Sequence, residues 1–277
     1  VIGILFGRPG SWPWESSAPM PTVLVTAAAN DGPSQALARE LGAKLGGLLQ
    51  SQSASMQLIG EVESSSRQPD LTLEVGRVAD PGAVGAHILL IGAPDRAILW
   101  SKEFEEASGN LAELKQHTAL TVAQVLGCAL EGTESSDRLD QKTLKLYIDG
   151  CAQAAEVGAG DPHSVIATLR QVIAVLRQVV DKSPRFKAAW AKLLLVEAKA
   201  TLAERDAPLP IRRSALVAGT PATRISLRQD VIRARELHPE IIEILLAESA
   251  LLPAGAYGET LRLLDRAKQR SPENASV

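Results

Sequence analysis

Hydrophobic positions in the first half of the chain alternate with polar ones or form short runs, which is the pattern of β-strands. Such runs occur at residues 23–27, 56–60, 71–78, 84–92 and 97–104. Two other segments, around 34–49 and 110–130, carry apolar residues every three or four positions, as one face of a helix does. The order β-α-β-β-β-β-α predicts an α+β unit over residues 22–131, in which two helices cover a small mixed sheet.

From about residue 140 the strand pattern stops and helical spacing continues to the end of the sequence. The segments RARELHP and RAKQRSP end at Pro239 and Pro272, which are 33 residues apart, and a related segment ends at Pro184. A period near 34 residues is typical of the tetratricopeptide repeat, a pair of packed helices. We therefore predict an all-α tetratricopeptide-like helical array over residues 140–277.

Three helix pairs make up the predicted array, and a Pro-rich insertion at 205–221 interrupts the middle pair. The predicted pairs are 141–156 with 163–182, 186–204 with 222–237, and 240–252 with 256–271. The polar residues 132–137 separate the array from the α/β unit, and further repeats are expected after residue 277 because the last helix lacks a polar capping helix.

The first 21 residues resemble neither region. Residues 1–7, VIGILFG, are too few to cross a bilayer, which takes about 20 residues, but they are typical of the end of a transmembrane helix. Trp12 and Trp14 would then lie at headgroup level, and the prolines that follow predict an extended linker. The alternative is an N-terminus with two incidental tryptophans.

Composition and charge exclude several classes of function. The net charge is −3 and aromatic residues make up 3% of the chain, so the basic surface and the stacking platforms of nucleic-acid binding are missing. Two cysteines are too few for a zinc site of three or four thiolates. The four histidines are scattered and lack the i, i+4 spacing that places two imidazoles on one helix face. Motifs of hydrolases, metalloproteases, phosphate-binding loops and dinucleotide-binding folds are also absent from the sequence. We predict a protein that is not an enzyme, with no catalytic residues, no metal and no cofactor.

The hairpin and helix between residues 92 and 130 carry a more specific pattern. The matching positions are Leu99, Trp100, Ser101, Phe104 and Glu105 in the hairpin and Leu111, Leu114, Gln116 and Val122 in the helix. This pattern resembles the TolB-like N-terminal domain of bacterial membrane-anchored regulators. The chain departs from that family at Thr26 and Ala27, where Pro-Phe is usual, and at 71–76, where the family strand is longer.

In that family, a TolB-like domain and tetratricopeptide repeats form the extracytoplasmic part of membrane-anchored winged-helix regulators of the ToxR/CadC-like class and of related nucleotide cyclases. The resemblance implies a non-catalytic extracytoplasmic sensor or protein-interaction region, held at the bacterial inner membrane by a preceding transmembrane helix and lying in the periplasm. Its partner would be another protein or a second copy of the chain, with no direct binding of nucleic acid by this region. The alternatives are a periplasmic scaffold or adaptor that binds a partner through its helical repeats, and a cytoplasmic location.

Both cysteines of the chain lie near the junction of the two predicted regions. In the periplasm, Cys128 and Cys151 could form a disulfide that ties the α/β unit to the first repeat helix. Such a bond would close a loop of about 23 residues and stabilise the fold by roughly 3 kcal/mol. The alternative, which the sequence alone favours, is two small buried helix residues that pack without a bond.

A partner is expected to dock on the first helices of the three pairs, because the curvature of a solenoid presents them as a concave surface. Lys192, Glu197 and Glu248 are charged residues on these otherwise apolar helices. Burial of an unpaired charge costs several kcal/mol, so we expect the three side chains to line an open groove. The alternative is that they face solvent on an outer surface.

Overall fold

The structure is a computed structural model, and it describes residues 21–51, 57–59, 68–80, 83–107, 110–134, 138–157, 161–207 and 223–270. The predictions for the first 20 residues, for most of the 205–221 insertion and for Pro272 lie outside the described residues. Within the described residues, no helix is both long enough and apolar enough to cross a membrane.

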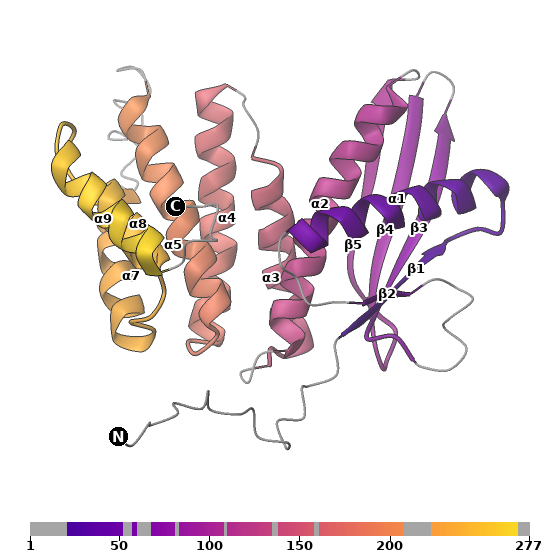
Figure 1. The fold of residues 1–277 in the computed structure, drawn as a ribbon, viewed down its shortest axis with the longest axis horizontal. Helices are drawn as coiled ribbons and strands as arrows, with labels where there is room; N and C mark the ends of the chain where they lie inside the picture. Colours follow the sequence, from indigo (N-terminus) through magenta and orange to yellow (C-terminus); the bar gives the residue numbers. More distant parts are fainter. Residues whose placement is uncertain are drawn as a thin grey trace, which may run out of the picture.

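One mixed sheet contains all the described strands, in the order β2-β1-β3-β4-β5 (Figure 1). The strands are β1 (Thr22–Ala27), β2 (Gln57–Ile59), β3 (Leu71–Asp80), β4 (Ala83–Gly92) and β5 (Ala97–Ala107). Strand β1 is parallel to β2 and β3, while β3, β4 and β5 are successive antiparallel neighbours. Each strand corresponds to one of the apolar or alternating runs in the sequence.

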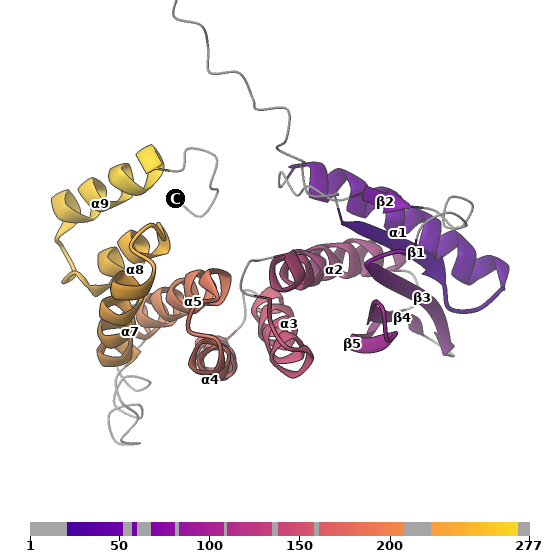
Figure 2. The same cartoon turned by 90° about the horizontal axis from the view of Figure 1, so that it is seen from below.

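Two helices cover one face of the sheet, α1 (Gly32–Ser51) and α2 (Leu111–Glu134) (Figure 2). Leucines of α1 at the predicted helical spacing, Leu37, Leu41 and Leu45, are buried in the core. On the other side of this layer, the alternation of β3 buries Leu71, Leu73 and Val75. The apolar residues at every second position of β3 and at every third or fourth position of α1 therefore pack in one layer.

The second half of the described chain is helical. Its helices are α3 (Gln141–Ala155), α4 (Pro162–Lys182), α5 (Lys187–Asp206), α7 (Thr223–Leu237), α8 (Glu243–Leu251) and α9 (Tyr257–Arg270). Each lies within a few residues of a helix predicted from the sequence. A mixed α+β fold with a helical region is confirmed; its tetratricopeptide character stays a prediction.

Pro184, which the repeat spacing singled out, lies in the turn between α4 and α5. Its carbonyl oxygen accepts a hydrogen bond from Trp190 Nε1 at 2.8 Å and lies 3.1 Å from His238 Nε2. Trp190 is completely buried, so its indole N–H needs an internal partner. The turn between α4 and α5 is thereby fixed to the end of α7.

The hydrophobic core runs without a break from the sheet into the helices. One cluster of buried residues includes Leu45 of α1, Val122 of α2, Tyr147 of α3, Trp190 of α5 and Ile244 of α8. Helix α3 also packs along β5, the edge strand of the sheet. Helices α2 and α3 thus join the α/β unit to the array, at the place where both cysteines lie.

Candidate binding groove beside the disulfide

Close helix packing brings α2 and α3 together. Asp140 caps α3, because its carboxylate accepts hydrogen bonds from the backbone N–H groups of Lys142 and Thr143 at 3.0 and 3.1 Å. These bonds and that of the Thr143 hydroxyl lower the pKa of Asp140. Near the end of α2, a Cβ on Gly132 would collide with a methyl carbon of Leu144, so a larger residue at this position would require the Leu144 side chain to move.

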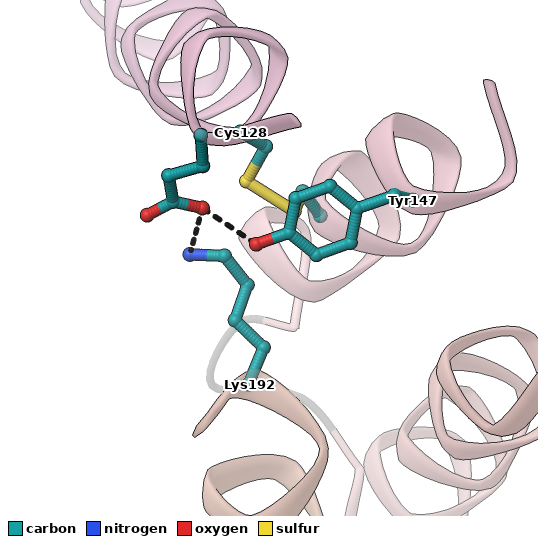
Figure 3. The surroundings of a disulfide bond; sticks show 5 residues. Cys128, Tyr147 and Lys192 are labelled. Carbon is teal, nitrogen blue, oxygen red and sulfur yellow. Dashed lines mark hydrogen bonds and ion pairs between the residues drawn. A yellow bond between two sulfur atoms is a disulfide. The ribbon is translucent and has the colours of Figure 1, made fainter. Parts of the chain in front are cut away.

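A disulfide joins the two helices, between Cys128 of α2 and Cys151 of α3 (Figure 3). The Cα atoms are 6.6 Å apart, within the range that a disulfide spans. Both cysteines are buried, so each also packs in the core as a small apolar residue. The expectation that the sequence favoured, packing without a bond, is therefore wrong, although both residues are buried as it predicted.

A polar network lies next to the disulfide and reaches a third helix. Glu131 follows Cys128 by one turn of α2, and its Oε2 accepts a hydrogen bond from the hydroxyl of Tyr147 at 2.5 Å. The same oxygen lies 3.5 Å from Nζ of Lys192 on α5 (Figure 3). Burial and the neighbouring Glu131 carboxylate raise the pKa of Tyr147, so its hydroxyl remains a donor at neutral pH.

Helices α2, α3 and α5 enclose a cavity of about 410 Å³, which we call the disulfide groove. Both cysteines line it, together with residues from each of the three helices and one from α4: Ala123, Gln124, Gly127, Glu131, Gly150, Ala154, Leu176, Lys192, Leu195, Val196 and Lys199. Polar and apolar groups share the exposed lining about equally, and two lysines lie on the α5 wall.

The two lysines of the groove differ in their partners. Lys192 pairs with Glu131, whereas Lys199, seven residues further along α5, is exposed and forms no ion pair with any described residue. The groove therefore offers apolar contacts and one free ammonium group. That combination can bind an anionic group, and neither lining cysteine offers a free thiol, because the two are bonded to each other. Among the described residues, no group of three or more His, Cys, Asp or Glu could hold a metal ion.

Glu197 does not line an open groove, and that prediction is wrong. Its side chain is completely buried between α4, α5 and α7, where one of its oxygens accepts a hydrogen bond from the guanidinium group of Arg177, which also pairs with Asp230. Burial and the neighbouring Asp230 raise the pKa of Glu197 to about 9. The carboxyl group is therefore protonated at neutral pH, which removes the cost of a buried charge that the prediction relied on.

Glu248 does not line the disulfide groove, and its predicted place on the concave surface of the array stays a prediction. Its carboxylate on α8 pairs with Arg235 on α7, and neither residue lines the cavity. Of the residues predicted from the sequence, the structure therefore brings together Cys128, Cys151 and Lys192, and it separates the two glutamates from them.

Sequence reasoning missed the polar residues in and beside the groove and the residues that contact Glu197. Glu131, Tyr147 and Lys199 carry no local signal, since they meet only through packing of separate helices. The sequence did carry a signal for the partner of Glu197. Arg170 and Arg177 on α4 are seven residues apart, and so are their partners on α5, Glu204 and Glu197. Charges at matched heptad spacing on neighbouring helices predict interhelical pairs.

Comparison with known proteins yields little. No family model and no curated protein matches the chain. One solved structure that matches is the dodecamer of a PelC point variant from Paraburkholderia phytofirmans, with 14% sequence identity and a TM-score of 0.27, over 39% of this chain and 84% of that one. The TolB-like and tetratricopeptide resemblances therefore stay predictions.

Proposed function

We propose that this chain is a non-catalytic sensor and protein-interaction region, and that a short acidic segment of a partner protein docks in the disulfide groove. The observation that carries the proposal is the cavity of about 410 Å³ between α2, α3 and α5, with Lys199 exposed at its wall. A cavity of this size accommodates a few side chains, which suits a short segment of a protein.

The charges around the groove favour an acidic segment. Glu131 already accepts from Tyr147 and pairs with Lys192, so its charge is compensated within the protein. A carboxylate that enters beside Lys199 gains an ion pair without breaking one. Leu195 and Val196 on the same wall would contact the apolar residues of the segment.

The disulfide supports an extracytoplasmic location. Disulfides persist in oxidising compartments such as the bacterial periplasm and are rare in the cytosol. Attachment to the inner membrane and a role in transcriptional or nucleotide signalling rest on the TolB-like resemblance, and we include both in the proposal.

Sensing would follow from the position of the groove. Helix α2 covers the sheet, while α5 belongs to the helical array, so a segment bound between them contacts both parts of the molecule. Such a segment shifts the arrangement of the two parts only if it binds one arrangement more tightly than the other.

Binding of short labelled peptides, measured by fluorescence anisotropy, tests this proposal. Peptides of Glu and Leu should bind, and peptides with Lys in place of Glu should not. Lys199→Glu should weaken binding of the acidic peptides by at least about tenfold, the effect of losing one ion pair in a partly desolvated site. Since Lys199 is exposed, its replacement should change stability by less than about 1 kcal/mol.

Arg39→Glu is the matched control, because Arg39 is an exposed cation on α1 and does not line the groove. It should leave peptide binding unchanged. The proposal is wrong if Lys199→Glu binds the acidic peptides as the unmodified protein does, or if substitution of Glu103 on the sheet abolishes binding while Lys199→Glu does not.

A further inference from the structure

A second and larger cavity lies where the end of the sheet meets the start of α3. Its volume is about 630 Å³, within the range of pockets that hold small molecules. Separate segments form its walls: the residues before β3, the turn between β4 and β5, the end of α2 and the start of α3. The cavity is distinct from the disulfide groove and shares no lining residue with it.

Leucines from both halves of the molecule line the apolar part of this junction cavity. Leu71 and Leu99 come from the sheet, and Leu139 and Leu144 come from the segment that begins α3. All four are buried, so this part of the wall is fixed by the core. It suits an aliphatic or aromatic group of a ligand.

Charged groups line the same cavity. Arg138 is exposed and has no ion pair with a described residue. Asp95 accepts a hydrogen bond from Nε2 of Gln141 at 2.9 Å, and Asp70 accepts from the backbone N–H of Thr22 at 2.8 Å. One arginine and two aspartates therefore line the same cavity.

We propose that the junction cavity binds a small zwitterion with an apolar side group, which is the chemistry of an apolar α-amino acid. The carboxylate of the ligand pairs with Arg138, because a guanidinium binds a carboxylate through two parallel hydrogen bonds. Its ammonium group faces Asp95 and Asp70, and its side group covers the leucines. A ligand with only a negative charge would be repelled by the two carboxylates, and a ligand with only a positive charge would be repelled by Arg138.

Such a ligand would act at the contact between the two parts of the molecule. The hydrogen bond from Gln141 to Asp95 joins the start of α3 to the hairpin turn of the sheet. An ammonium group on Asp95 competes with Gln141 for the same carboxylate, so occupancy alters this contact. The sensing role rests on the proposed function, whereas binding of the ligand does not.

Isothermal titration calorimetry with L-leucine and L-phenylalanine tests the proposal on the whole chain. At least one of the two should bind. Leucinamide, which lacks the carboxylate, and isocaproate, which lacks the ammonium group, should each bind at least about tenfold more weakly than leucine. Arg138→Gln should weaken leucine binding by a similar factor, while Arg39→Gln, on α1, should leave it unchanged.

The proposal is overturned if neither amino acid binds, if leucinamide or isocaproate binds as tightly as both amino acids, or if Arg138→Gln binds leucine and phenylalanine as the unmodified protein does. Arg138 is exposed, and circular dichroism will show that its variant is folded. The calorimetry and the peptide experiment can fail independently. Acidic peptides can bind when amino acids do not, and amino acids can bind when acidic peptides do not.

Discussion

The carboxyl group of Glu197 is enclosed by three helices. The guanidinium group of Arg177 contacts both this carboxyl group and that of Asp230, and Oε2 of Glu197 has no hydrogen-bond partner among the described residues. Because the neutral form is favoured in this position, the folded protein holds a proton that the unfolded chain releases above its ordinary pKa of 4.5. A single side chain thus makes stability depend on pH.

Stability should decline as pH rises. The pKa of Glu197 in the folded protein is about 9, above its value of 4.5 in the unfolded chain. Its contribution is therefore fully present below pH 4.5 and is lost progressively as pH rises toward 9, by at most about 1.4 kcal/mol per pH unit. Glu197→Gln keeps the shape of the protonated acid, so it should remove this slope and stabilise the protein at pH 8.

Urea unfolding at a series of pH values measures this effect. Glu105→Gln on β5 is the control, because Glu105 is exposed and lies far from Asp230; it should retain the slope. Equal slopes for the Glu197→Gln variant and the unmodified protein between pH 6 and 9 would show that Glu197 is ionised when buried.

At the level of helices and strands, the periodicity of the sequence predicted most of the architecture. The leucine spacing of α1 and the alternation of β3 are local patterns that burial imposes. The polar contacts of the groove were not predictable, because Glu131, Tyr147 and Lys192 lie on three helices and meet only after packing. For the same reason, the sequence placed Glu197 in an open groove, since its partners Arg177 and Asp230 lie on other helices.

Removal of the disulfide should loosen the α2–α3 pair. Cys128→Ser combined with Cys151→Ser frees a loop of 23 residues in the unfolded chain, which in the chain-entropy model lowers the free energy of unfolding by roughly 3 kcal/mol. Urea unfolding of the oxidised protein and of the double variant measures the difference. A thiol assay on denatured protein from an oxidising compartment should find no free thiol, and two reactive thiols would rule the bond out.

Across the whole molecule, a continuous core connects the sheet to the helical array, and two cavities lie along that connection. The disulfide groove lies between α2, α3 and α5, and the junction cavity lies between the sheet and the start of α3. Helix α3 contributes to both, and Glu156, the residue that follows it, forms an ion pair with Lys102 of the edge strand β5. An occupant of either cavity can therefore influence how α3 sits against the sheet.

The division at residues 131–140 into an α/β unit and a helical array stays a prediction. Cys128 and Cys151 lie on opposite sides of that boundary, so the disulfide spans it. A partner in the disulfide groove would contact both sides of the boundary through α2 and α5. We propose that an acidic segment binds at that place.

Photo-crosslinking with an acidic Glu/Leu peptide shows where on the protein the peptide binds. Three variants of the oxidised protein carry p-benzoylphenylalanine in place of Lys199 in the groove, Arg39 on α1 or Glu103 on the sheet. Since the Lys199 variant loses the proposed ion pair, the peptide is supplied well above its dissociation constant. We predict crosslinks at position 199 and none at positions 39 and 103. Crosslinks at position 39 or 103, with position 199 unmodified, would show that the peptide binds outside the disulfide groove.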